Sequence, residues 1–163
     1  MRPEDQRDHR DRYTVVPRTL IFLTRGNQVL LLKGAASKRL WAGKFNGLGG
    51  HLEPGESPYR SALRELNEET GLTVQDLQLR GIVHVTLPAP PGVMLFVFVG
   101  EGSDGELRPS EEGTPLWIDR EQLASLPVVE DLKELLPRIL RPGPVVFAHY
   151  NVTEVGLRMT FDR

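Results

Sequence analysis

The chain has 163 residues, close to the usual size of one domain, with 39% hydrophobic residues, 26% charged residues and a formal net charge of −2. This composition is that of a globular protein, and it excludes a disordered chain and a strongly cationic binder of nucleic acid polymers. Cysteine is absent, which excludes disulfides, thiolate metal sites and cysteine nucleophiles, and the longest apolar run (residues 93–99) is too short for a membrane helix.

The amino-terminal segment is charged throughout. Residues 2–12 carry four arginines and four acidic residues and no apolar core, so we expect a mobile arm over residues 1–13 rather than a secretory leader. Residues 14–163 are then predicted to form a single domain of a cytoplasmic protein.

The elements that follow are predicted from apolar patterning and turn residues. A hairpin is expected over residues 19–23 and 28–33, around Arg25-Gly26-Asn27. Ser57 and Pro58 supply an N-cap and a first helical residue, and Gly71 is placed to end that helix. The remaining expectations are strands at 79–87, 93–100 and 116–118, a capping box at Asp119 and Gln122, a helix over 129–140 distorted by Pro137, and a hairpin within 145–161. Hairpins and helices of this kind favour an α/β fold with a mixed sheet between helices.

The helix predicted after Ser57 carries an unusual acidic face. A helical projection places Ala62 and Leu66 on the stripe that faces the core, and it gathers Glu65, Glu68 and Glu69 on a neighbouring face with no lysine among them. Like charges at this spacing destabilise an isolated helix, unless a cation binds the face. Three hard oxygen donors suit Mg²⁺, with Mn²⁺ as the alternative.

The same segment resembles a known family. Gly50, five residues, Glu56, seven residues, Arg64-Glu65-Leu66, one residue, Glu68-Glu69, one residue and Gly71-Leu72 match all nine defined positions of the Nudix box. The chain is therefore identified as a member of the Nudix hydrolases, which cleave nucleoside diphosphates linked to another group.

The resemblance implies an α/β/α sandwich and a role for each matching residue. The metal ligands would be Glu65, Glu68, Glu69 and the carbonyl of Gly49. Arg64 would orient a box glutamate, Gly50, Glu56 and Gly71 would support the loop and helix, and Glu65 or Glu68 would act as the general base, a choice that the sequence leaves open.

A further metal ligand outside the box is expected at Glu111 or Glu112. Nudix enzymes sometimes carry such a glutamate, and we favour Glu112 because Glu112-Gly113-Thr114-Pro115 precedes the strand of Trp117. The alternative is a solvated acidic loop. Trp41 and Trp117 are expected in the core. Four basic residues are candidates for contacts with a triphosphate, namely Lys33, Lys38, Arg39 and Lys44.

The resemblance extends to the oxidised-purine nucleoside triphosphatases, which include the MutT-like 8-oxo-dGTP diphosphatases. Residues 45–50 (FNGLGG) are similar to the segment before the box in these enzymes, which implies that Asn46 contacts the base. Glu130-Asp131 stands where they place an acidic pair, whereas a tryptophan of the mammalian type is replaced by Val128-Val129. Structural alternatives stay open, because Asn46 can cap the glycine turn and acidic residues are favoured at a helix start.

We therefore predict a metal-dependent nucleoside triphosphate diphosphohydrolase acting on 8-oxo-dGTP, with a small nucleotide as its partner and a monomeric or homodimeric state. The alternative within the family is hydrolysis of ADP-ribose or a dinucleoside polyphosphate, for which Pro88, 16 residues past Leu72, is a marker. The alternative of another class is a non-catalytic nucleotide-sensing module, against which the intact Glu65, Glu68 and Glu69 argue.

Overall fold

The structure of the protein, a computed structural model, describes residues 12–162, so most of the predicted arm lies outside the described residues. Of that arm, Arg12 and Tyr13 are described, and the Tyr13 hydroxyl lies 2.9 Å from Nε2 of His84. Within residues 12–162, no helix has the length and apolar character needed to cross a membrane. The elements along the chain are β1 (Val15–Arg25), β2 (Gln28–Gly34), β3 (Phe45–Asn46), α1 (Pro58–Thr70), β4 (Gln78–Thr86), β5 (Gly92–Glu101), β6 (Gly113–Asp119), a 3-10 helix (Arg120–Gln122), α2 (Leu132–Ile139), β7 (Val146–Thr153) and β8 (Gly156–Asp162).

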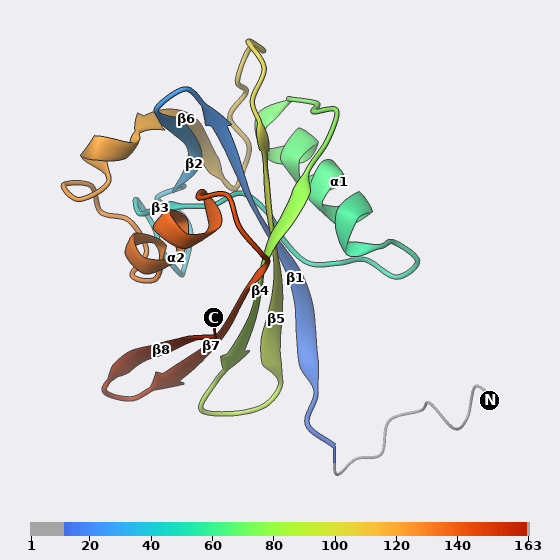
Figure 1. The fold of residues 1–163 in the computed structure, drawn as a ribbon, viewed down its shortest axis with the longest axis vertical. Coiled ribbons are helices and arrows are strands. Elements are labelled where there is room, and N and C mark those ends of the chain that lie inside the picture. The colour runs from blue at the N-terminus through green and yellow to red at the C-terminus, as the bar shows by residue number, and fades with distance from the viewer. Residues whose placement is uncertain (1–11, 163) are drawn as a thin grey trace.

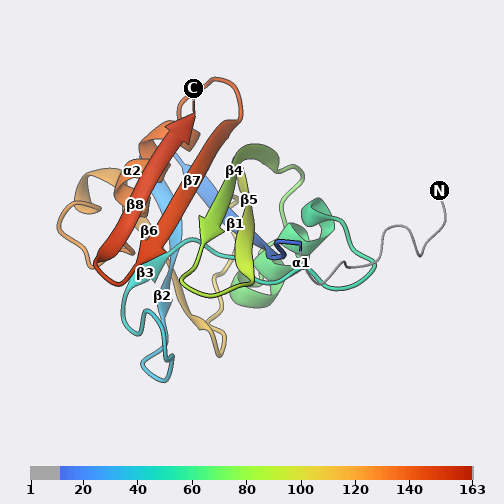
Figure 2. The same ribbon diagram turned by 90° about the horizontal axis from the view of Figure 1, so that it is seen from below.

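The strands form one eight-stranded sheet, and it is mixed, as predicted. Their order is β3-β2-β1-β5-β4-β7-β8, and β6 pairs with β2 beside this path. The β1–β5 and β4–β7 pairs are parallel, and the other pairs are antiparallel. Figure 2 shows the β7–β8 hairpin continuing the sheet beyond β4.

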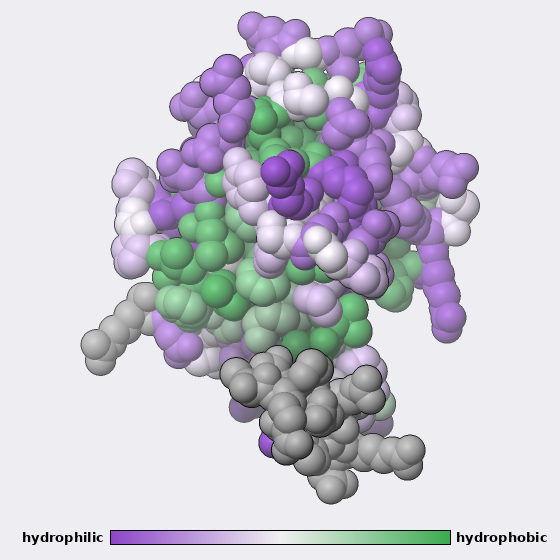
Figure 3. Space-filling view, turned by 90° about the vertical axis from the view of Figure 1, so that its right-hand side faces the viewer, coloured by the Kyte–Doolittle hydropathy of each residue, from purple (hydrophilic) through white to green (hydrophobic). Residues whose placement is uncertain are grey.

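The two helices cover opposite faces of the sheet (Figure 1). Residues alternate between the faces along β1, so Leu20 and Phe22 join the core beneath α2, whereas Ile21 and Leu23 join the core beneath α1. The result is a helix–sheet–helix sandwich with an apolar core on each side. Hydrophilic side chains predominate over much of the outer face that carries α1, above an apolar area lower down (Figure 3).

A gap beside β1 positions the site. β1 pairs with β2 only at Thr24 and Arg25, near the turn, and the two strands then separate. The glycine-rich segment, residues 47–50, pairs with β1 where β2 does not. Thr19 N–H donates to the Gly50 carbonyl (2.8 Å), and Ile21 N–H donates to the Leu48 carbonyl (2.7 Å). Residues 48–50 are thereby held at the mouth of the opening between β1 and β2.

Several predicted elements have different limits in the structure. β1 begins at Val15 rather than at residue 19, because it pairs with β5 from Val15 onward. β6 extends over Gly113–Asp119 rather than 116–118, along the full length of β2. The helix predicted over 129–140 begins only at Leu132, because Val129 N–H donates instead to the carbonyl of Phe45 (2.9 Å).

The predicted capping box at Asp119 and Gln122 is wrong. Asp119 precedes a 3-10 helix of three residues and makes no side-chain cap hydrogen bond. Pro137 lies inside α2 without ending it. The two predicted hairpins are confirmed, and so are the strands predicted at 79–87 and 93–100, which pair with each other as β4 and β5.

Candidate active site

Helix α1 is built from local signals. The Ser57 side chain accepts a hydrogen bond from the Arg60 amide (3.3 Å), Pro58 occupies the first turn, and Gly71 ends the helix with φ = 75°. Ala62 and Leu66 are fully buried against the sheet. This apolar contact fixes the rotation of the helix, and therefore the direction in which its acidic residues point.

The glycine loop lies against that acidic face. Gly49 has φ = 129°, and a Cβ there would collide with the Thr19 carbonyl of β1. A Cβ at Gly50 would collide with the Glu65 carboxylate. At Gly49 the positive φ and the close approach to the strand require glycine. The loop backbone therefore lies directly against the carboxylates.

Arg64 holds together the residues that flank this loop. Its guanidinium donates to both carboxylate oxygens of Glu56 (3.1 and 2.7 Å), to Glu65 (3.0 Å) and to Glu68 (3.1 Å), and it also reaches the His51 carbonyl (3.1 Å). The hydrogen bonds from Arg64 lower the pKa of Glu56 to about 2, so this carboxylate stays ionised. Arg64 thus fixes the orientation of the Glu65 and Glu68 carboxylates through these hydrogen bonds.

Glu69 is the most buried of the acidic residues. It is 3% exposed and accepts a hydrogen bond from the Gly49 amide (2.7 Å). Burial, together with the negative charges of Glu65 and Glu68, raises the pKa of Glu69 to about 7, although the Gly49 hydrogen bond and the charge of Lys38 act in the opposite direction. The acidic cluster therefore carries negative charge that its surroundings do not fully balance.

The donors of this cluster fit a hard divalent cation. Glu65, Glu68 and Glu69 offer carboxylate oxygens, and the Gly49 carbonyl accepts no hydrogen bond from any described residue. Such oxygen ligands suit Mg²⁺ or Mn²⁺. Within residues 12–162 no group of three histidine, aspartate or glutamate side chains is arranged to hold a metal ion. Glu65 and Glu68 are hydrogen-bonded to Arg64, and Glu69 to the Gly49 amide.

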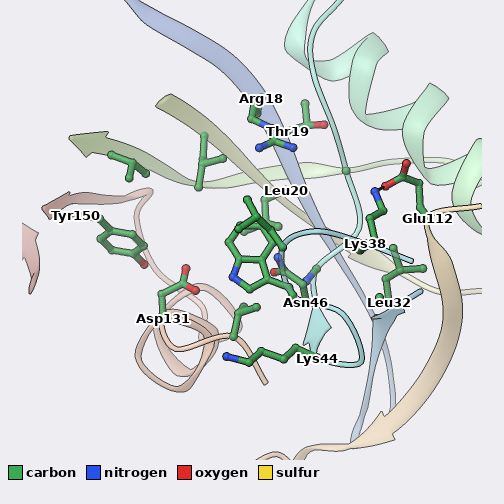
Figure 4. A pocket seen from close by; sticks show the side chains of 18 of the residues that line it. Arg18, Thr19, Leu20, Leu32, Lys38, Lys44, Asn46, Glu112, Asp131 and Tyr150 are labelled. Atoms are coloured by element: carbon green, nitrogen blue, oxygen red, sulfur yellow. Dashed lines mark hydrogen bonds and ion pairs between the residues drawn. The ribbon is translucent and has the colours of Figure 1, made fainter. Parts of the chain in front are cut away.

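A cavity of about 260 Å³ begins at this loop and runs along the sheet (Figure 4). Glu69 and Gly49 line one part of it, and Asn46 and Asp131 line another. Glu112 also lines the cavity and forms an ion pair with Lys38, whereas Glu111 is exposed and does not line it.

The residues expected to contact the base are only partly brought together. The Asn46 carbonyl oxygen accepts a hydrogen bond from the Gly47 amide (2.7 Å), so this side chain caps the turn while it also lines the cavity. Asp131 faces the cavity, and burial, together with the charge of Glu130, raises its pKa. The expectation for Glu130 is not met, because it is exposed and does not line the cavity. Both residues precede α2, which begins at Leu132, and Glu130 is exposed whereas Asp131 is partly buried.

Other predictions for the cavity need correction. Lys38 and Lys44 line it, whereas Lys33 and Arg39 do not. Trp41 is not a core residue, because it is 49% exposed and lines the opening. The sequence analysis also missed Arg18, from β1, and did not single out Tyr150, from β7. Their one available signal was the alternation of buried and exposed positions along each strand.

Comparison with known proteins gives a consistent assignment. A family model for the NUDIX domain matches residues 14–139. The oxidized purine nucleoside triphosphate hydrolase of Danio rerio is 34% identical over 106 residues, which cover 64% of this chain and 67% of that protein. The NAD-capped RNA hydrolase NudC of Stutzerimonas stutzeri (strain A1501) is 32% identical over 138 residues, which cover 80% of this chain, but the chain spans only 48% of that protein. Among solved structures, the MutT protein from Bacillus halodurans superposes with a TM-score of 0.78 at 25% identity, over 91% of this chain and 98% of that one.

Proposed function

This chain belongs to the Nudix hydrolases, enzymes that act on pyrophosphate bonds, and we propose that it hydrolyses an oxidised purine nucleoside triphosphate, with 8-oxo-dGTP as the favoured substrate. The products would be the nucleoside monophosphate and pyrophosphate. The similarity to the oxidized purine nucleoside triphosphate hydrolase of Danio rerio, which extends over two thirds of that protein, supports this choice.

The observation that carries the proposal is the continuity of the cavity. A single opening is lined by residues of the acidic site, Glu69 and Gly49, and by two side chains with the chemistry to read a base, Asn46 and Asp131. A nucleoside triphosphate has the matching layout, with a base at one end and phosphates at the other. Figure 4 shows Asn46 and Asp131 directed into the same space.

The base end offers both donors and acceptors. Because the Asn46 oxygen is held by the Gly47 amide, its NH₂ group is the part that can donate to a base. The Asp131 side chain lines the same part of the cavity, and its carboxylate oxygens can accept hydrogen bonds from N–H groups of a base. Guanine presents N7 and O6 as acceptors, and oxidation at C8 places a proton on N7, so a combined donor and acceptor matches the oxidised edge better.

The phosphate end combines cations with the acidic cluster. Arg18, Lys38 and Lys44 line the cavity and can pair with phosphate oxygens. Glu65, Glu68, Glu69 and the Gly49 carbonyl would hold the divalent ion, for which we propose Mg²⁺, and Glu112 would join them once a phosphate competes for Lys38. When bound, the ion supplies neutralisation of the phosphate charge and activation of water.

The proton of the attacking water would pass to a carboxylate. Glu65 and Glu68 both accept a hydrogen bond from Nη1 of Arg64, which holds them ready on the face of α1. Glu68 is 57% exposed and Glu65 is 15% exposed. We keep both as candidates for the general base, and Arg64 as the residue that positions them.

A substrate panel tests the reaction. We expect the protein with Mg²⁺ to hydrolyse 8-oxo-dGTP faster than dGTP, ADP-ribose, diadenosine tetraphosphate and NAD, and to release pyrophosphate rather than phosphate. Faster turnover of ADP-ribose, diadenosine tetraphosphate or NAD than of 8-oxo-dGTP would contradict the proposed substrate. The enzyme would then be a Nudix hydrolase of another substrate class. A protein that binds these nucleotides but turns over none would be a sensing module.

A substitution at Asn46 tests recognition of the base. If its NH₂ group contacts the base, Asn46→Ala should lower kcat/KM for 8-oxo-dGTP by about 10- to 100-fold. The ratio of 8-oxo-dGTP to dGTP hydrolysis should fall, because the phosphate contacts are untouched. Asn27→Ala, in the β1–β2 turn outside the cavity, is the matched control and should leave the ratio unchanged. An equal loss of kcat/KM for both nucleotides would show that Asn46 only caps the turn and does not read the base.

A further inference from the structure

Tyr150 is a cavity residue that the proposed chemistry does not yet use. It lies in the middle of β7, opposite Val85 of β4 and Met159 of β8. Ala148 and Tyr150 are buried, whereas their neighbours Phe147 and His149 are exposed. The alternation places the Tyr150 side chain on the face of the sheet that carries α2 and the cavity.

The ring of Tyr150 is accounted for by packing. It meets Phe161 of β8 edge to face, with ring centroids 6.0 Å apart, and belongs to the core beneath α2. A phenylalanine would make the same contact. The hydroxyl group is therefore the part of this residue that the core does not explain.

That hydroxyl group is buried without a partner. Tyr150 is 3% exposed, and its Oη makes no hydrogen bond to any described residue. Figure 4 shows Oη directed towards the end of the cavity where Asp131 lies. An unpaired buried hydroxyl group lowers stability, so its presence is favoured where a ligand supplies the missing partner.

We propose that Tyr150 is a base-recognition residue whose hydroxyl group donates a hydrogen bond to a carbonyl oxygen on the edge of a bound purine, beside Asp131. This inference rests on the proposed function and deepens it by adding a donor from β7 to the polar groups of Asn46 and Asp131. The ligand class is a purine nucleotide with an exocyclic oxygen on its base, as in guanine and 8-oxoguanine.

A purely structural role and a ligand role make opposite demands on the hydroxyl group. If Oη serves the fold, its removal should lower stability. If Oη forms its hydrogen bond only with a bound ligand, Tyr150→Phe should leave the melting temperature of the free protein unchanged or raise it, because an unpaired polar group is removed from the interior. The same variant should bind the base less tightly.

The experiment is calorimetric titration with 8-oxo-dGMP and, separately, with deoxyribose 5-phosphate, which lacks the base. Tyr150→Phe should bind 8-oxo-dGMP about ten-fold more weakly than the unaltered protein and bind the sugar phosphate equally well. Tyr59→Phe is the matched control, because it removes a hydroxyl group that bonds to Asp76 and does not line the cavity. It should leave both affinities unchanged.

Three results with the Tyr150→Phe variant would overturn the inference. They are an unchanged affinity of Tyr150→Phe for 8-oxo-dGMP, an equal loss for the sugar phosphate, and a melting temperature that falls together with both affinities. If the unaltered protein bound no 8-oxo-dGMP, the inference would also fall. The substrate panel on the unaltered protein decides the proposed function separately, so the two failures are distinguishable.

Discussion

Arg64 shows how one side chain can organise several others. Its planar guanidinium reaches Glu56, Glu65, Glu68 and a backbone carbonyl at once. A lysine has three donors around a single nitrogen and lacks the rigid fork that spans these positions. The orientation of the two candidate bases therefore depends on the geometry of Arg64 as well as on its charge.

We expect Arg64→Lys to raise the Mg²⁺ concentration needed for half-maximal activity, and to lower kcat, by roughly 10- to 100-fold, because partners that orient ligands have effects of this size. Mg²⁺ titrations of the hydrolysis rate measure both quantities. Arg60→Lys makes the same exchange at an exposed position of the same helix and should change neither. An Arg64→Lys protein with a normal Mg²⁺ requirement would show that charge alone is needed.

The residues of the site differ in how far the sequence reveals them. Glu65, Glu68 and Glu69 lie on one helix, so their spacing alone places them on one face. Arg18 and Tyr150 come from strands separated by most of the chain, and no local spacing links them. Glu130 and Trp41 were misjudged because the direction of a side chain at a helix start or in an irregular loop depends on the surrounding fold.

At the scale of elements, α1 is the part of the fold that its own sequence specifies most completely. Its N-cap, its apolar stripe and its terminal glycine all lie within residues 57–71. The start of β1 depends instead on β5, and the start of α2 depends on the bond between Val129 and Phe45. Their predicted limits were wrong because these partners are distant along the chain.

The caps of α1 should contribute to stability without setting specificity. We expect Ser57→Ala to lower the free energy of unfolding by about 1 kcal/mol, because the Arg60 amide loses its acceptor. Urea denaturation measures this change. Ser103→Ala, at an exposed position without a side-chain hydrogen bond to a described residue, is the control and should fall within about 0.5 kcal/mol of the unaltered protein. A shift in the ratio of 8-oxo-dGTP to dGTP hydrolysis on Ser57→Ala would contradict this separation of roles.

At the scale of the whole molecule, the sheet links the acidic cluster to both cores. The core beneath α1 contains Ala62 and Leu66, and the strand residues of that core alternate with those of the core beneath α2. A single domain of this size usually unfolds cooperatively. Binding of an ion to the face of α1 should then stabilise the entire folded chain.

We expect Mg²⁺ to raise the melting temperature of the unaltered protein and to have no such effect on Glu69→Gln. A ligand at 100 times its dissociation constant adds about 2.7 kcal/mol to the stability of the state that binds it. The amide of glutamine keeps an oxygen for the Gly49 hydrogen bond but lacks the charge that would hold the ion. Without metal, the variant should be as stable as the unaltered protein or more stable, because the repulsion from Glu65 and Glu68 is relieved.

Thermal denaturation with EDTA and with Mg²⁺ provides the four melting temperatures that this prediction needs. Glu134→Gln removes an acidic residue from α2 that pairs with Arg138 at the surface, so it should keep the full response to Mg²⁺. Hydrolysis of 8-oxo-dGTP by Glu69→Gln should fall by roughly 10²- to 10⁴-fold in the same samples. If Glu69→Gln retained the Mg²⁺-dependent rise, the ion would bind elsewhere in the molecule, and the buried carboxylate beside Gly49 would have to be explained by the fold alone.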